Sequence, residues 1–84
     1  MNIDVTKMDG LWISGTIGDA RFSAKVYDLG SDYGINGGRV SKLWIRGVAS
    51  YDRGWDQKAR SASDLKMVNE LVGFLEEAPK LQDR

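Results

Sequence analysis

Two neighbouring segments alternate between apolar and polar residues and predict a β-hairpin. Residues 11–17 and 20–28 each place apolar side chains at every second position, which is the period of a strand with one buried face. Only Gly18 and Asp19 separate them, and glycine in the first position of a two-residue loop suits a type II′ turn. The expected register pairs Ile17 with Ala20, and on the polar face it sets Trp12 opposite Lys25, Ser14 opposite Ser23 and Thr16 opposite Arg21.

A third alternating segment, residues 39–46, extends the sheet. It places Leu43 and Ile45 on the apolar face, and the other face receives Val40, Lys42, Trp44 and Arg46. The dipeptide Arg46-Gly47 allows a turn into a short fourth strand ending near Tyr51. We therefore expect a meander of three to four antiparallel strands over residues 11–53.

The C-terminal part has the pattern of one amphipathic helix. Ser61 and Asp64 form a capping pair ahead of the apolar residues, and Pro79 disfavours helical geometry at Ala78. At about 100° per residue, one side collects five apolar residues: Leu65, Val68, Leu71, Val72 and Leu75. The sequence predicts a helix over about residues 62–78 that covers the apolar sheet face, which gives an α+β fold with the opposite sheet face open.

Composition narrows the chemistry more than the fold. The 84 residues suit a single domain over residues 1–84, and they include no Cys and no His, which excludes thiolate nucleophiles, imidazole bases and zinc sites built on N or S ligands. We expect no enzyme activity, no catalytic residue, no metal and no cofactor. Basic and acidic residues cancel, and no long apolar run is present, so we expect no membrane partner and a cytoplasmic location.

Three strings resemble a known family. They are FSAKVYD at residues 22–28, YGINGGRVSKL at residues 33–43 and YDRGWD at residues 51–56. Together they resemble a family of short proteins of unknown function found largely in bacteriophages and mobile elements. The resemblance implies a small sheet with a C-terminal helix and an origin in a phage or prophage, in which case the compartment is the host cytoplasm.

The glycine-rich loop between the second and third strands is a candidate anion site. Gly37, Gly38 and Arg39 could present backbone N–H groups and a guanidinium to a phosphate or carboxylate. The loop leads into a strand, so it is neither a Walker motif nor a dinucleotide fingerprint. The alternative interpretation, which we favour, is a structural loop with a turn at Asn36-Gly37.

The open sheet face carries interleaved aromatic and cationic side chains, which allow three interpretations. The first is a protein interface, for which Trp, Tyr and Arg are the favoured anchors. The second is a platform for nucleotides or single-stranded nucleic acid, because aromatic rings stack on bases while cations bind phosphates. In the third, Trp12 and Lys25 simply form a cation–π pair on a solvated face. Zero net charge disfavours nucleic acid. With the loop arginine, the candidate binding residues are Trp12, Lys25, Tyr27, Arg39, Lys42, Trp44 and Arg46.

The string YDRGWD allows an ion pair between Arg53 and a flanking carboxylate, with Trp55 covering the end of the core. On the helix, Met67, Phe74 and Ala78 form an apolar flank, so a homodimer through this flank or an open sheet edge is possible.

Two functional hypotheses follow. The favoured one is a non-catalytic protein-binding module, in concrete form a phage-encoded inhibitor of a host defence protein such as a CRISPR–Cas component. The alternative is a module that binds a nucleotide or single-stranded nucleic acid on the basic aromatic face.

Overall fold

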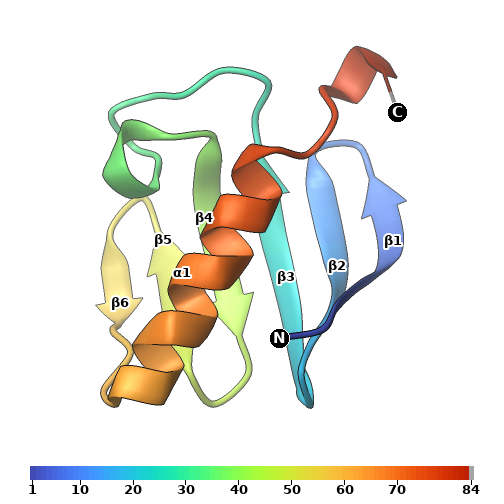
Figure 1. Cartoon of the computed structure of the whole chain (residues 1–84). Coiled ribbons are helices and arrows are strands. Elements are labelled where there is room, and N and C mark those ends of the chain that lie inside the picture. Colours follow the sequence, from blue (N-terminus) through green and yellow to red (C-terminus); the bar gives the residue numbers. More distant parts are fainter. Residues whose placement is uncertain (84) are drawn as a thin grey trace.

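The computed structural model describes residues 1–83 and contains one antiparallel sheet with one long helix. The sheet has six strands in the order β1-β2-β3-β4-β5-β6 (Figure 1). The meander and the α+β class are confirmed, but the expected three to four strands were too few. The strands are β1 (Ile3–Asp9), β2 (Trp12–Ile17), β3 (Ala20–Val26), β4 (Val40–Ile45), β5 (Ala49–Asp52) and β6 (Trp55–Gln57).

The β2–β3 hairpin has the predicted register. Ile17 pairs with Ala20, and Trp12 lies opposite Lys25. Gly18 has a φ of 56°, which a glycine adopts without steric cost in the first position of such a turn. Local turn chemistry therefore fixes which side chains share each face.

The two strands missing from the sequence prediction are both edge strands. In β1 the pairing shifts between Val5 and Lys7, so a bulge at Thr6 breaks the alternation of apolar residues. Strand β6 has three residues, all exposed. Trp55 lies there with its ring edge-to-face on Tyr51, 5.0 Å between centroids, and is not one of the fully buried core residues.

One glycine is required where β1 pairs with β2. Gly15 of β2 faces the covered side of the sheet, and a Cβ at this position would lie 1.9 Å from the carbonyl oxygen of Asp4. That separation is far below van der Waals contact, so the backbone of β1 can approach only because residue 15 has no side chain.

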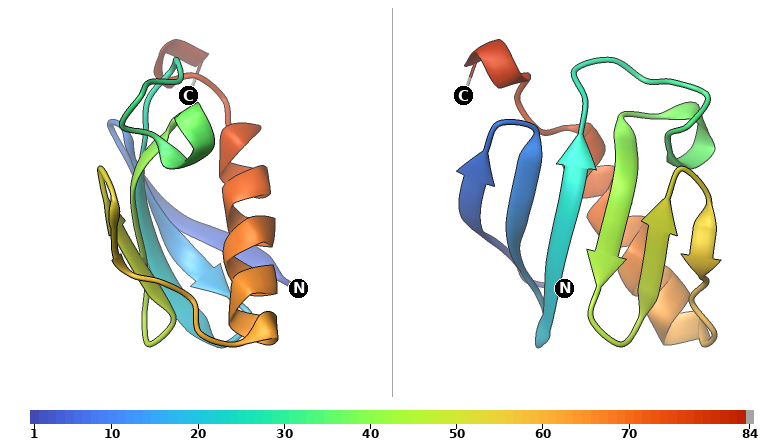
Figure 2. Two further views of the ribbon diagram at one scale, coloured as in Figure 1. Left: turned by 90° about the vertical axis from the view of Figure 1, so that its left-hand side faces the viewer. Right: turned by 180° about the vertical axis from the view of Figure 1, so that it is seen from behind.

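Helix α1 (Ala62–Glu76) covers one face of the sheet and leaves the other free of described elements (Figure 2). It begins as predicted, with the Ser61 hydroxyl accepting a hydrogen bond from the Asp64 N–H at 3.0 Å. It ends at Glu76, two residues before the expected end. Within residues 1–83, no helix combines the length and apolar character that crossing a membrane would need.

The core lies between α1 and the covered sheet face. The helix contributes Val68, Leu71 and Leu75, whereas Leu65, expected among them, is 52% exposed. Val40 was expected on the open face, but the β3–β4 pairing shifts around Ser41, and this bulge turns Val40 into the core. The principal strand contributions are Ile13, Ile17, Phe22, Ala24, Val26, Val40, Leu43 and Ile45.

Candidate functional site

Strand pairing arranges the side chains of the helix-free face in rows: two contain its tryptophans, and a third contains Asp4, Thr16 and Arg21. The first row runs from one side of the sheet to the other as Asp9, Trp12, Lys25, Lys42 and Asp52. The second row contains mainly small polar side chains around one tryptophan: Lys7, Ser14, Ser23, Trp44, Ser50 and Gln57. The structure thus brings Trp12, Lys25, Lys42 and Trp44 of the predicted set onto one surface.

Trp12 and Trp44 flank a small polar surface formed by Ser14 and Ser23. Between them, the hydroxyls of Ser14 and Ser23 lie 3.3 Å apart in a hydrogen bond. Trp44 borders a shallow hollow of about 410 Å³, and Trp12 borders another of about 330 Å³. Both tryptophan side chains are exposed.

Lys25 pairs across the strands with Trp12, but its charge contacts a different ring. Its Nζ lies 5.2 Å from the centre of the Tyr27 ring, so the cation–π contact that one of the three interpretations assigned to Trp12 is made with Tyr27. Lys42 Nζ lies 3.8 Å from a carboxylate oxygen of Asp52, and both side chains are substantially exposed. Such a pair contributes little to stability. Arg46 follows β4 and is exposed.

Arg39 is placed away from this surface, at the C-terminal end of α1. Its Nη1 donates to the carbonyl oxygens of Glu76 and Ala78 at 2.7 and 2.8 Å, and its Nε donates to the carbonyl of Tyr27 at 2.8 Å. The last carbonyls of a helix have no partner within it and carry partial negative charge. Arg39 therefore supplies the cation that the last turn of α1 lacks.

The glycine-rich loop does hold an anion, and that anion belongs to the chain itself. The Glu76 carboxylate accepts hydrogen bonds from the N–H of Arg39 at 2.8 and 3.0 Å and from the N–H of Val40 at 3.2 Å. A Cβ on Gly38 would lie 2.4 Å from a Glu76 oxygen. The loop thus closes on the end of the helix, a contact that the sequence did not predict.

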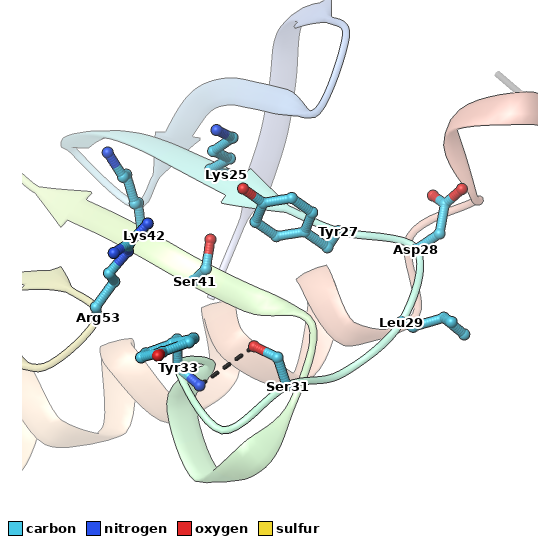
Figure 3. Close-up of a pocket in the computed structure, with 9 residues that line it drawn as sticks. All are labelled: Lys25, Tyr27, Asp28, Leu29, Ser31, Tyr33, Ser41, Lys42 and Arg53. Carbon is cyan, nitrogen blue, oxygen red and sulfur yellow. Dashed lines mark hydrogen bonds between the residues drawn. The ribbon is translucent and has the colours of Figure 1, made fainter.

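A third hollow, of about 510 Å³, lies beside the first row (Figure 3). Lys25, Tyr27 and Lys42 of the predicted set line it, together with residues that sequence reasoning did not select: Asp28, Leu29, Ser31, Tyr33, Ser41 and Arg53. Arg53 does not form the ion pair with a flanking carboxylate that the string YDRGWD allowed. Its guanidinium carbon lies 5.3 Å from the centre of the Tyr33 ring. All three strings that carry the family resemblance contribute to this hollow, and that convergence was the available signal.

Comparison with known proteins assigns a family. Residues 11–75 match the model of a family described as a domain of unknown function (DUF7678). The match runs from just before β2 to Leu75 of α1, and so includes both the helix-free face of β2–β5 and the third hollow. No curated protein and no solved structure matches the chain. Because the family model covers well over half of the sequence, the chain belongs to the DUF7678 family.

Proposed function

We propose that this protein is a non-catalytic module that binds another protein in stoichiometric amounts through the helix-free face of its sheet. The supporting observation is the pair of indole rings of Trp12 and Trp44, which are 40% and 45% exposed. Tryptophan is among the residues that contribute most to binding energy at protein interfaces. Two rings flanking a flat polar floor suit a protein surface that buries both at once.

The charges on this face favour a protein over a nucleic-acid strand. The first row ends in Asp9 on one side and Asp52 on the other, so a polyanion laid across the sheet would meet a carboxylate at each end. The chain as a whole has zero formal net charge. Binding to single-stranded nucleic acid, which relies on phosphate contacts, is the alternative that the experiment below tests.

The identity of the partner rests on the family resemblance of the three strings. A phage or prophage origin favours a host defence protein as partner, either a CRISPR–Cas component or another defence factor, in the host cytoplasm. A small module without a catalytic site would inhibit such a partner by occupying its working surface. In this proposal the inhibition depends on the concentration ratio of the two proteins.

The test compares two tryptophans that lie in different surroundings. Wild type, Trp44→Ala and the control Trp55→Ala are titrated against a panel of purified defence complexes. We expect Trp44→Ala to weaken the complex by about 30-fold, or about 2 kcal/mol. Trp55→Ala should change affinity less than about threefold, because Trp55 lies in β6 with its ring against Tyr51 of β5.

Three outcomes would each contradict the proposal in whole or in part. Equal affinity of all three proteins for a bound partner would exclude this face as the docking surface. Tight binding of labelled single-stranded DNA or RNA that falls steeply with salt and vanishes in Trp44→Ala would favour the nucleic-acid alternative. If no complex of the panel binds, the defence role is wrong.

We also propose weak self-association through the edge strand β1. A groove of about 310 Å³ between β1 and the end of α1 is lined mainly by apolar side chains, including Val5, Met8 and Phe74. Phe74 and Met8 are 42% and 45% exposed. Of the other two residues of the expected helix flank, Ala78 also lines this groove, whereas Met67 packs against the core away from it. The apolar contact surface therefore lies further toward β1 than the helix pattern suggested.

A further inference from the structure

We propose that the third hollow binds a small phosphate-bearing ligand with a flat ring, of the size and chemistry of a mononucleotide. This site goes beyond the protein-docking surface: it shares Lys25 and Lys42 with the helix-free face, but neither Trp12 nor Trp44 lines it. Its volume of about 510 Å³ lies within the range of about 300–1,000 Å³ that is usual for small-molecule sites. The argument rests on its cations, on one buried hydroxyl and on the support of its walls.

Three cations surround the hollow, and their charges are poorly balanced by carboxylates. Lys25 and Arg53 each lie over a tyrosine ring and form no salt bridge with the described residues. Lys42 has a partner only at 3.8 Å. The lining carboxylate, Asp28, accepts a hydrogen bond from the N–H of Leu81 at 2.7 Å, and Figure 3 shows it apart from the three cations. A phosphate would supply the missing negative charge.

Ser41 gives independent evidence for a ligand. The residue is 5% exposed, and its hydroxyl has no hydrogen-bond partner. Buried polar groups in folded proteins almost always have a partner, so an unpaired one calls for an explanation. Ser41 is the extra residue of the β4 bulge, and bulges commonly redirect a side chain next to a binding site. Its hydroxyl points toward the space between Lys25, Tyr27 and Lys42 (Figure 3).

The conformation of Arg53 also points to a role. Its φ is 60°, a left-handed value that costs a non-glycine residue energy and that accumulates at functional sites. Gly54 follows directly, yet the strained position holds the arginine. The backbone N–H of Arg53 donates to the Ser41 carbonyl at 3.1 Å, so the turn that presents the guanidinium is attached to the bulge that presents the hydroxyl.

The walls of the hollow are held before any ligand arrives. The Tyr51 hydroxyl donates to the Tyr33 carbonyl at 2.8 Å, and the Tyr33 N–H donates to the Ser31 hydroxyl at 3.2 Å. The first bond ties the long β3–β4 loop to the sheet, and the second lies within the loop. The rings of Tyr27 and Tyr33 then offer apolar contact to the base of a nucleotide, while the three cations bind the phosphate of the same nucleotide. Preorganisation of this kind lowers the entropy cost of binding.

The experiment is a titration of the full chain with AMP, followed by calorimetry or NMR shifts, with adenosine and inorganic phosphate as partial ligands. We expect an AMP dissociation constant of about 100 μM at physiological salt. Each partial ligand should bind at least about tenfold more weakly, because each supplies only the ring or only the charge. Equal binding of phosphate and AMP would exclude a role for the ring.

Two matched arginine substitutions separate the site from general charge. Arg53→Gln should weaken AMP binding by about tenfold or more, whereas Arg46→Gln, which removes an exposed cation outside the hollow, should change it less than about twofold. Ser41→Ala should also weaken binding by about fivefold, through loss of one hydrogen bond to the ligand. Melting curves without ligand show that each variant is folded.

Several outcomes would overturn the proposal. They are no AMP binding at millimolar concentration, equal losses in the two arginine variants, or tighter binding of a short single strand than of AMP. Trp44→Ala should leave AMP affinity unchanged, because Trp44 does not line this hollow. Failure of the protein-docking surface and failure of this site are therefore distinguishable.

Discussion

The two faces of the sheet follow different rules, although the same strands build both. On the face toward α1, apolar side chains such as Phe22 and Leu43 are almost completely buried. On the helix-free face, two indole rings and several cations remain exposed. The apolar composition of the first face follows from folding alone, because burial of apolar area under α1 drives folding. The second face contains groups whose partners the described chain does not supply.

Arg39 and Arg53 show the same contrast between two single residues. Arg39 donates to three backbone carbonyls and thereby attaches the end of α1 to the β3–β4 loop. Arg53 lies over one tyrosine ring and occupies a strained backbone position. Arg39 contributes to stability through these bonds, although its Nη2 is buried without a hydrogen-bond partner. Arg53, which is held at an energetic cost, is a candidate for binding.

The largest expected effect tests the covered face. Leu71→Ala should lower the free energy of unfolding by about 2–5 kcal/mol, because it leaves a cavity at the centre of the helix–sheet contact. Trp44→Ala, on the helix-free face, should change it by less than about 1 kcal/mol. Urea unfolding followed by circular dichroism measures both. Comparable losses would mean that the two faces contribute equally to stability.

The next effect concerns the carboxylate that occupies the glycine-rich loop. Glu76→Gln should lower the free energy of unfolding by about 1–2 kcal/mol, because it weakens the charge-assisted hydrogen bonds to the N–H groups of Arg39 and Val40. Glu77→Gln removes the same charge from an exposed neighbour and should cost less than about 0.5 kcal/mol. Equal results for the two glutamates would show that the loop does not depend on its internal anion.

The free energy of self-association should be smaller than these losses of stability, because the groove beside β1 is small. At high concentration, light scattering should give a mass above the 9.3 kDa of one chain, and Phe74→Asp should return it to the monomer value by placing a charge in an apolar contact. A constant monomer mass at all concentrations would reject the dimer.

The smallest expected change has an unusual sign. Ser41→Ala should leave the free energy of unfolding unchanged or raise it by up to about 1 kcal/mol, because it removes a buried hydroxyl that has no partner. Thermal unfolding without ligand measures this. A marked loss of stability would mean that the hydroxyl has a structural role, and would weaken the contrast between the faces.

Features that depend on neighbours in the chain were predictable. The β2–β3 register follows from alternation and from the Gly18-Asp19 turn, and the start of α1 follows from the Ser61 cap. The open face and its residues Trp12, Lys25, Lys42 and Trp44 followed from the same alternation. Each of these features is set by residues a few positions apart, so the sequence alone contains the necessary information.

The tertiary structure decided what distant segments do to one another. Strand β1 bulges and β6 is short, so neither has a clean period, and both form because a neighbouring edge offers unpaired backbone groups. In β4 the apolar residues Val40 and Leu43 are three positions apart, which breaks the period of two at the bulge. Only strand pairing shows that Ser41 is the extra residue. Glu76 fills a loop far away in sequence, and three separate strings meet around Arg53, because packing brings together residues that no local pattern relates.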